Sequence, residues 1–433
     1  QINQLTQPLV WLVERDIQGP NGQTIQALVP VVYLNDIGEG ELLASGAVIA
    51  GDNVRITASE AVNNLGGTIA GRQVLSIESE GDITNAQGTL TGGNVLLKAG
   101  GNVNNLAKTT TQTFGNATKD TLEGVGTIAA TGNLQIIAGN DITDQAGNIS
   151  AYGNLALQAG NNIDLQNVAV STTRDGSFAR SSNTQQNVSQ LQSGGNLSLI
   201  AGNDITAAGT QFESDGSIRL QAGNNLALSA VQEEASQFQG DSRNFTQSES
   251  STANTVSLAA NNNISLLAGV SPGAGGGNLT LEGTAVTSEA GDVLLQATGD
   301  VTLAAARDTA SSSSKTTSTS RGILSSSTTT TQTSQSSDTA KVTELVANGA
   351  LQIVAGKNVT SQGSQVLAEG SVLLDAQGDV LLDVATNSTT QTQQTSKSQS
   401  GLSFSGGGLF IGSRSEQAGK LGDQSQNVAS TLI

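Results

Sequence analysis

The sequence predicts an all-β protein, a right-handed parallel β-helix with about 21 residues per coil and Ser/Thr-rich hairpin excursions. The first observation is a repeat between Gly132 and Leu165, in which Leu134 and Ile136 recur as Leu155 and Leu157. A fixed period of about 20 residues is typical of solenoids. The second observation is the alternation within a copy, because residues two apart on a strand point to the same face.

Gly139 and Asn140 follow the first strand of this repeat, and both residue types tolerate the positive φ of a turn. Three short strands and three turns fit into about 21 residues, whereas helical repeats need about 33 or more. The strong bias of parallel β crossovers predicts right-handed winding. On the order of 16 coils, stacked about 4.8 Å apart, would form a rod of roughly 75 Å.

Further copies keep the same offsets and predict continuous aliphatic rows in the core. The rows are Leu197 with Ile218, Leu199 with Leu220, Leu351 with Val372, Ile353 with Leu374, and Val54 with Val74 and Val95. At the turns, Asn140 with Asn161 and Asn203 with Asn224 are expected to form amide ladders. Ordinary turn chemistry accounts for these Asn and Gly residues, so we interpret them as structural.

Polar segments divide the chain. Residues 1–45 do not follow the repeat, contain three of the four prolines, and are predicted to form a hairpin cap or a junction with a preceding domain. Residues 46–384 are predicted as the β-helix, with excursions near 108–121, 171–193, 231–254 and 307–342. Residues 385–433 are predicted as a last excursion, to about 415, and a tail. The excursions could be flexible loops, but their Thr-rich alternation favours β-hairpins.

Composition limits the classes of function. The net charge of −18 argues against a nucleic-acid partner and fits an extracellular surface. No apolar run approaches the roughly 20 residues of a membrane helix. The first residues lack the regions of a signal peptide, so a mature fragment or a segment of a longer protein is expected.

The absence of His and Cys excludes a Ser-His-Asp triad, a Cys-His pair and a His-ligated metal. Glu233 and Glu234 are adjacent and would point to opposite faces of a strand. Asp141 and Asp204 occupy equivalent turn positions, where capping is expected. We therefore expect no catalytic, cofactor-binding or metal-binding residue, and a carbohydrate-active β-helix enzyme is the least favoured alternative.

One segment, Gly401–Gly412, alternates apolar and small residues around glycines. Such alternation is typical of β-hairpins that interact with membranes. The candidate residues for membrane or partner contact are Leu402, Phe404, Leu409, Phe410 and Ile411. Alternatively, this hairpin could fold over the flank of the solenoid and bury these side chains.

The motif G-N-L-x-L-x-A-G-N-D-I-T and the excursion after Leu303–Thr309 resemble the filamentous hemagglutinin repeats of two-partner secretion exoproteins. The opening QPLVWLVERDIQGPNGQTIQALVPVVYL is similar to the segment before the later repeats of CdiA-type contact-dependent growth-inhibition effectors. The resemblance implies a β-helical filament, exported through an outer-membrane transporter and displayed on a Gram-negative cell surface. It implies either delivery of a toxin, with the later repeats contacting the target outer membrane, or adhesion to host cells or biofilm.

Overall fold

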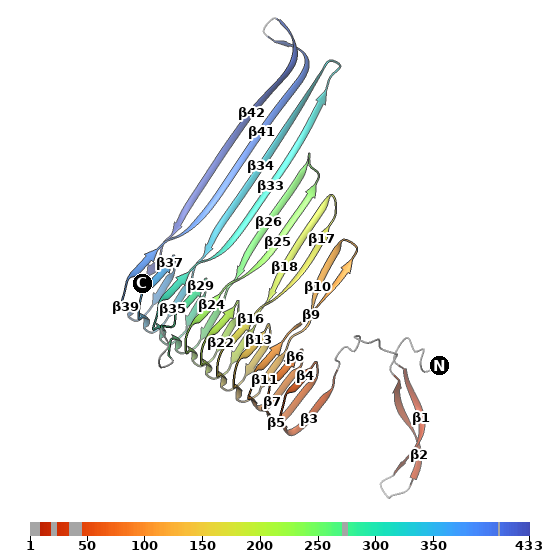
Figure 1. Cartoon of the computed structure of the whole chain (residues 1–433), viewed down its shortest axis with the longest axis vertical. Helices are drawn as coiled ribbons and strands as arrows, with labels where there is room; N and C mark the ends of the chain where they lie inside the picture. Colours follow the sequence, from red (N-terminus) through yellow and green to blue (C-terminus); the bar gives the residue numbers. More distant parts are fainter. Residues whose placement is uncertain (1–8, 19–23, 34–45, 271–275, 406–407) are drawn as a thin grey trace. The chain divides into compact units, whose positions relative to one another are not determined.

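The computed structural model describes residues 9–18, 24–33, 46–270, 276–405 and 408–433 (Figure 1). The chain divides into two units, Gln1–Ala47 and Val48–Ile433. In the first unit, β1 (Leu9–Gln18) pairs antiparallel with β2 (Thr24–Tyr33). Residues 19–23, between these two strands in the sequence, lie outside the described residues. Whether this hairpin is a cap or a junction remains a prediction.

The second unit is a parallel β-helix whose coils have three faces, as the 21-residue pattern predicts. On the first two faces, β3 (Val48–Ala58), β5 (Thr68–Ser79) and β7 (Thr89–Ala99) bend from one face to the next. The later first-face strands are β11 (Thr127–Ala130), β14 (Asn148–Ala151), β19 (Gln190–Ser193), β22 (Gln211–Ser214), β27 (Ser257–Ala260), β30 (Ala285–Ser288), β35 (Glu344–Ala347), β38 (Gln365–Ala368) and β43 (Thr431–Leu432). The later second-face strands are β12 (Leu134–Ala138), β15 (Leu155–Ala159), β20 (Leu197–Ala201), β23 (Ile218–Ala222), β28 (Ile264–Ala268), β31 (Val293–Ala297), β36 (Leu351–Ala355) and β39 (Val372–Ala376).

The third face is an eleven-stranded parallel sheet within the described residues. Its strands are β4 (Val62–Leu65), β6 (Ile83–Ala86), β8 (Val103–Leu106), β13 (Ile142–Gln145), β16 (Ile163–Gln166), β21 (Ile205–Ala208), β24 (Leu226–Ser229), β29 (Leu279–Glu282), β32 (Val301–Ala304), β37 (Val359–Gln362) and β40 (Val380–Asp383). Eleven coils at about 4.8 Å give a rod of roughly 50 Å. The expectation of 16 coils was wrong because the excursions contain many more residues than a turn needs.

The aliphatic rows form the core, as predicted. Leu134 pairs with Leu155 and Leu351 with Val372 in the parallel ladders. One row was assigned wrongly: Leu75, and not Val74, lies between Val54 and Val95. The register shifts between Gly71 and Val74, where β5 is one residue longer than β3 and β7, so counting from the sequence selects the wrong neighbour.

Side-chain ladders also run along the turns, but one position later than predicted. Asp141 Oδ1 accepts the side-chain amide of Asn161 and the main-chain N–H of Asn162, both at 2.9 Å. Asp204 Oδ1 in turn accepts the main-chain N–H of Asn225 at 2.8 Å. The acceptor is therefore Asp141, the residue after Asn140, because the side chain of Asp141 faces the main-chain N–H of the next coil.

A second ladder lies inside the first coils. Asn64 donates to Asn85 and Asn85 to Asn105, each at 2.8 Å, and Asn105 donates to Asp144 Oδ1 at 2.6 Å. In the next coil Leu165 takes the equivalent position. Asp144 is thus a fully buried carboxyl group at the end of a polar row. Burial raises the pKa of Asp144 to about 6, although hydrogen bonds to the side chain oppose the shift.

The five excursions are antiparallel hairpins, as predicted. Hairpin 1 is β9 (Lys108–Phe114) with β10 (Ala117–Gly124), hairpin 2 is β17 (Val168–Asp175) with β18 (Ala179–Asn187), hairpin 3 is β25 (Val231–Gly240) with β26 (Phe245–Asn254), hairpin 4 is β33 (Ala306–Arg321) with β34 (Ser325–Lys341), and hairpin 5 is β41 (Ala385–Ser405) with β42 (Gly408–Val428). Hairpin 5 extends past residue 415, because β42 matches the 21 residues of β41. Residues 431–432, expected as tail, return to the solenoid as β43 beside β38.

The hairpins pair with one another into one ten-stranded antiparallel sheet, which the sequence analysis did not predict (Figure 1). Two coils separate each hairpin from the next. Coils and hydrogen-bonded strands both repeat at about 4.8 Å, so two coils advance the rod by the width of one two-stranded hairpin. Each hairpin therefore emerges at the correct distance to extend the sheet formed by the hairpins before it.

After the third face, the chain either turns directly into the next coil or first forms a hairpin. In coils from which no hairpin leaves, a residue with positive φ turns the chain directly. These residues are Gly66, Gln87, Ala146, Gly209, Gly283 and Gly363. A Cβ built on Gly283 would lie 2.8 Å from the Cβ of Ala306, the first residue of hairpin 4. The glycine corner thus provides the space in which the root of the next hairpin packs.

Candidate interaction surface at the hairpin ends

The end of each hairpin lies away from the solenoid, and we define it as the turn with three strand residues on either side. Large apolar side chains are exposed at several of these ends: Phe114 is 63% exposed, Phe178 69% and Leu324 65%, and Ile323 is fully exposed. Six of the seven phenylalanines of the chain belong to hairpin ends, and the seventh, Phe212, lies in the solenoid core. Apolar side chains exposed in this pattern make the hairpin ends a candidate interaction surface.

At the end of hairpin 3, two half-buried aromatic rings contact each other. The rings of Phe238 and Phe245 stack with their centroids 5.8 Å apart. The guanidinium of Arg180, from hairpin 2, lies 4.7 Å from the centroid of the Phe238 ring. This contact favours cation–π attraction and joins the ends of two hairpins.

Neighbouring ends are connected through the main chain. The N–H of Gly240 donates to the carbonyl of Phe178 and links the ends of hairpins 2 and 3. The N–H of Leu402, the residue just before the end of hairpin 5, donates to the carbonyl of Leu324 at the end of hairpin 4. Both distances are 2.8 Å. Hairpin 4 is longer than hairpin 3, since Phe245 at the end of hairpin 3 pairs with Lys315 part of the way along β33. The apolar groups therefore lie at two levels along one sheet edge.

The five candidate residues of the sequence analysis lie on hairpin 5. Leu402 pairs with Ile411 and Phe404 with Leu409 in the antiparallel register. Leu402 is half-buried and Ile411 is 75% exposed. The side chains of Phe404, Leu409 and Phe410 lie outside the described residues. The strands of this hairpin extend away from the solenoid and do not fold over its flank (Figure 1).

Sequence reasoning missed the apolar residues at the other four ends. The signal was present, because Phe114 and Ile323 each lie beside a glycine in the middle of a polar excursion. An isolated apolar residue carries little weight in a single sequence. The pattern becomes visible only when the five turns are compared at equivalent positions in the structure.

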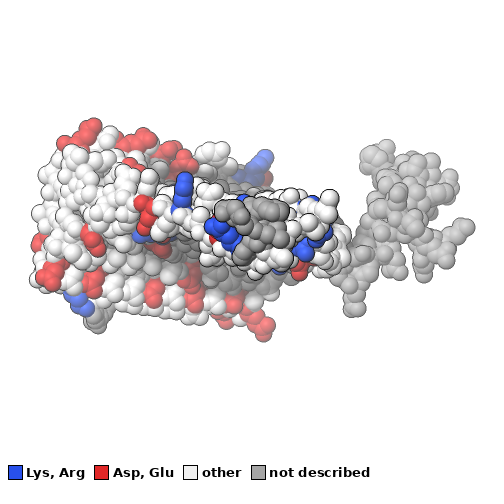
Figure 2. Space-filling model, turned by 90° about the horizontal axis from the view of Figure 1, so that it is seen from above, with Lys and Arg blue, Asp and Glu red and all other residues white. Residues whose placement is uncertain are grey.

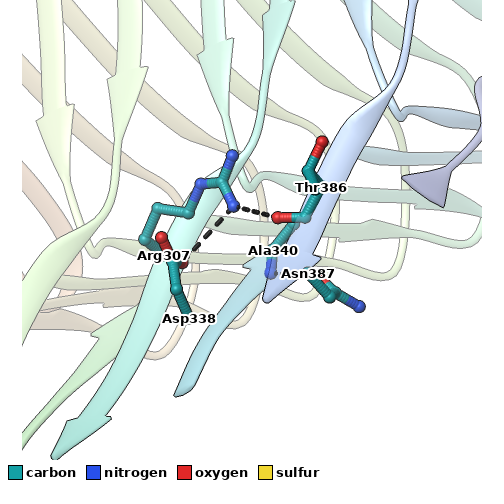
Figure 3. Close-up of polar contacts among 5 residues, drawn as sticks. All are labelled: Arg307, Asp338, Ala340, Thr386 and Asn387. Carbon is teal, nitrogen blue, oxygen red and sulfur yellow. Dashed lines mark hydrogen bonds and ion pairs between the residues drawn. The ribbon is translucent and has the colours of Figure 1, made fainter. Parts of the chain in front are cut away.

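The hairpin roots are held together by side chains where the main-chain pairing between hairpins stops. At each of the four junctions, the residue next to the last paired position accepts a main-chain N–H from the neighbouring hairpin. We call these residues the root acceptors. Asp120 accepts from the N–H of Ser171 at 3.1 Å, Glu233 from that of Gln186 at 3.4 Å, Asp308 from that of Ala253 at 2.7 Å, and Asn387 from that of Ala340 at 2.7 Å. Figure 3 shows the last junction, between hairpins 4 and 5. The ends are thus presented by a sheet that is connected from root to tip.

A solenoid of 21-residue coils with paired hairpins defines a repeat protein, and comparison identifies the class. The hemagglutinin repeat family matches residues 170–245, 238–329 and 324–432, more than half of the chain. The chain therefore belongs to the hemagglutinin repeat family. A second family, described as repeats of unknown function, matches residues 107–179.

Three curated relatives are similar to this chain. Deoxyribonuclease CdiA of Dickeya dadantii is 31% identical over 99% of the chain, which corresponds to 14% of that relative's length. Toxin CdiA of Yersinia pestis is 39% identical over 19% of the chain and 2% of the relative. The tRNA nuclease CdiA of Yersinia mollaretii is 28% identical over 34% of the chain and 5% of the relative. The chain thus spans a small part of each relative. No solved structure matches the chain.

Proposed function

We propose that this chain is a structural segment of a contact-dependent growth-inhibition exoprotein and that its hairpin ends contact the outer membrane of a target cell. The parent protein would be exported through an outer-membrane transporter of the two-partner type and displayed on a Gram-negative cell surface. Alignment of nearly the whole chain with a CdiA protein supports this parentage. The observation that carries the contact is the alignment of apolar residues at the hairpin ends of one sheet, with exposed side chains at the ends of hairpins 1, 2 and 4 and at Ile411 beside the end of hairpin 5.

The solenoid and the hairpins would have different tasks. Stacked aliphatic rows and uninterrupted parallel ladders make the solenoid a rigid spacer. The hairpins extend from it and present the apolar groups. The lack of His and Cys supports a role without catalysis, and the net charge of −18 supports a partner other than nucleic acid.

Binding of the 433-residue chain to outer-membrane vesicles and to protein-free lipid vesicles tests this proposal. The informative variant replaces Leu402, Phe404, Leu409, Phe410 and Ile411 with serine and keeps the hairpin length. We expect the unsubstituted chain to bind both kinds of vesicle and the serine variant to bind several-fold more weakly.

The matched control changes Ser398, Ser400, Ser413 and Ser415 of the same hairpin to alanine, and we expect it to bind like the unsubstituted chain. If the chain bound neither outer-membrane vesicles nor lipid vesicles, membrane contact would be contradicted. Binding to outer-membrane vesicles alone would indicate a protein receptor or glycolipid in place of the bilayer.

A further inference from the structure

The hairpin ends differ in charge from the chain as a whole. The hairpin ends contain five basic residues: Lys119, Arg174, Arg180, Arg243 and Arg321. They contain two acidic residues, Asp175 and Asp241. The chain as a whole has 18 basic and 36 acidic residues, so the ends reverse its charge balance.

The five basic side chains are available to a ligand. All five are exposed, and none forms an ion pair with another residue in the described ranges. Arg180 lies over the Phe238 ring and is still exposed to solvent. Asp241 already accepts the main-chain N–H groups of Arg243 and Asn244, at 2.7 and 2.8 Å. These N–H groups lower the pKa of Asp241, so it remains a turn cap.

Distance separates the basic ends from the acidic solenoid. The five basic residues lie on hairpins 1 to 4, whose strands of 7 to 17 residues rise by about 3.4 Å per residue, so these ends lie roughly 24 to 58 Å from the roots. The Debye length at physiological ionic strength is about 8 Å. A surface that meets the ends therefore experiences their charge and not the net charge of the chain. Seen from above in Figure 2, most of the visible blue lysine and arginine atoms lie on the narrow stack of hairpins, a few lie at the edge of the broader solenoid, and red carboxylates are spread over the solenoid.

We infer that the hairpin ends recognise phosphate-bearing lipid headgroups, with the arginines at the phosphates and the apolar side chains among the acyl chains. This inference rests on the proposed membrane contact and adds the class of lipid. Phenylalanine, leucine and isoleucine provide hydrocarbon contact that any bilayer would accept. Exposed guanidinium groups beside them bind phosphate oxygens through paired N–H donors and favour an anionic leaflet.

The test compares vesicles of phosphatidylcholine with vesicles that also contain phosphatidylglycerol, using the complete 433-residue chain. One variant changes Lys119, Arg174, Arg180, Arg243 and Arg321 to glutamine. Its matched control changes five exposed basic residues of the solenoid, Arg55, Arg72, Lys98, Arg219 and Lys357, to glutamine. The two variants have the same net charge and differ in where the positive charge is lost; the solenoid variant also removes the exposed ion pairs Arg55–Glu78 and Arg72–Asp52, so its fold is checked by circular dichroism.

We expect the unsubstituted chain to bind the anionic vesicles at least about tenfold more tightly, with a preference that weakens as salt is added. The hairpin-end variant should lose this preference, and the solenoid variant should keep it. Excess soluble glycerol phosphate should not displace the chain, because it offers no hydrocarbon.

Equal binding of the unsubstituted chain to both vesicle types, or equal loss in both variants, would overturn the lipid class and leave membrane contact in place. Displacement by glycerol phosphate would point to a free phosphate site and also overturn it. Absence of binding to every vesicle would overturn the proposed contact itself.

Discussion

Arg307, on the first strand of hairpin 4, donates from Nη1 to the main-chain carbonyl of Thr386 on hairpin 5, over 2.6 Å (Figure 3). The same nitrogen lies 3.3 Å from Oδ1 of Asp338, on the second strand of hairpin 4. One guanidinium group therefore connects β33, β34 and β41 near their roots. The contact complements the adjacent root acceptor, Asn387, and joins the two longest hairpins where their main chains begin to separate.

The root acceptors predict a local loss of stability when the acceptor is removed. Asp308→Ala should leave the N–H of Ala253 without its 2.7 Å partner, at a cost of about 1–2 kcal/mol. Hydrogen exchange of the amides near the roots of β26 and β33 measures the effect, and faster exchange is expected there. Asp308→Asn is the control, since Asn387 shows that an amide oxygen can serve at this position. Equal exchange in the alanine variant and the unsubstituted chain would contradict the role.

The glycine corner can be tested with a pair of residues that share the same backbone conformation. Gly283 and Gly115 both have φ of +59°, but a Cβ on Gly115 would meet no atom within 4 Å. Gly115→Ala should therefore cost only the left-handed strain of about 1 kcal/mol. Gly283→Ala should cost roughly 1–3 kcal/mol more, because its Cβ would also overlap that of Ala306. Denaturant unfolding of both variants measures the difference, and equal losses would show that the root is not packed on this corner.

The match between coil and hairpin spacing predicts which deletions the sheet tolerates. Deletion of residues 190–210 removes one coil and leaves a single coil between hairpins 2 and 3. The pairing of β18 with β25 should then be lost, because the roots would be about 4.8 Å too close. Hydrogen exchange of β18 and β25 provides the readout, and strong protection would contradict the spacing rule.

The control deletion removes residues 190–256, which are two coils together with hairpin 3. Hairpins 2 and 4 would then be separated by the usual two coils. We expect β18 to pair with β33 and to remain protected from exchange.

Asp144 predicts a dependence of stability on pH. Its folded-state pKa of about 6 is raised above the ordinary value of 3.8, so the folded chain holds the proton more tightly than the unfolded chain. The stabilisation is complete below about pH 4 and is lost as the pH rises through 6, with a change of up to roughly 3 kcal/mol. Asp144→Asn should remove this step, so that the two unfolding free energies diverge between pH 4 and 7.

The control for this experiment is Asp215→Asn, which changes an exposed carboxylate of the solenoid. It should follow the unsubstituted chain across the pH range. A pH profile for Asp144→Asn parallel to that of the unsubstituted chain would contradict the assignment.

The solenoid could be predicted from the sequence because the pattern that determines each coil lies within a short segment of the chain. Each coil repeats alternation and turn residues within 21 positions, so Leu134 and Leu155 identify each other without further structure. The prediction failed at Val74, where a one-residue bulge shifts the register.

The hairpin sheet could not be predicted in the same way. The pairing of Ser248 with Ser312 depends on the pitch of the rod between them and not on either sequence segment. For the same reason the candidate site was found only in hairpin 5, where several apolar residues cluster. Phe114 and Phe178 each occur singly in a polar segment, and they are recognised as parts of one candidate surface only when the hairpin ends are aligned in the structure.

The matched spacing of coils and hairpins also constrains how genes for such proteins can change in length. The unit that can be duplicated or lost in frame is two coils with one hairpin, because any other change would leave a hairpin without its neighbour. The hairpins begin at residues 108, 168, 231, 306 and 385, and the intervals lengthen along the chain as the hairpins grow. Recombination between such units would lengthen the filament while each new hairpin joins the same sheet, so reach and contact area would increase together.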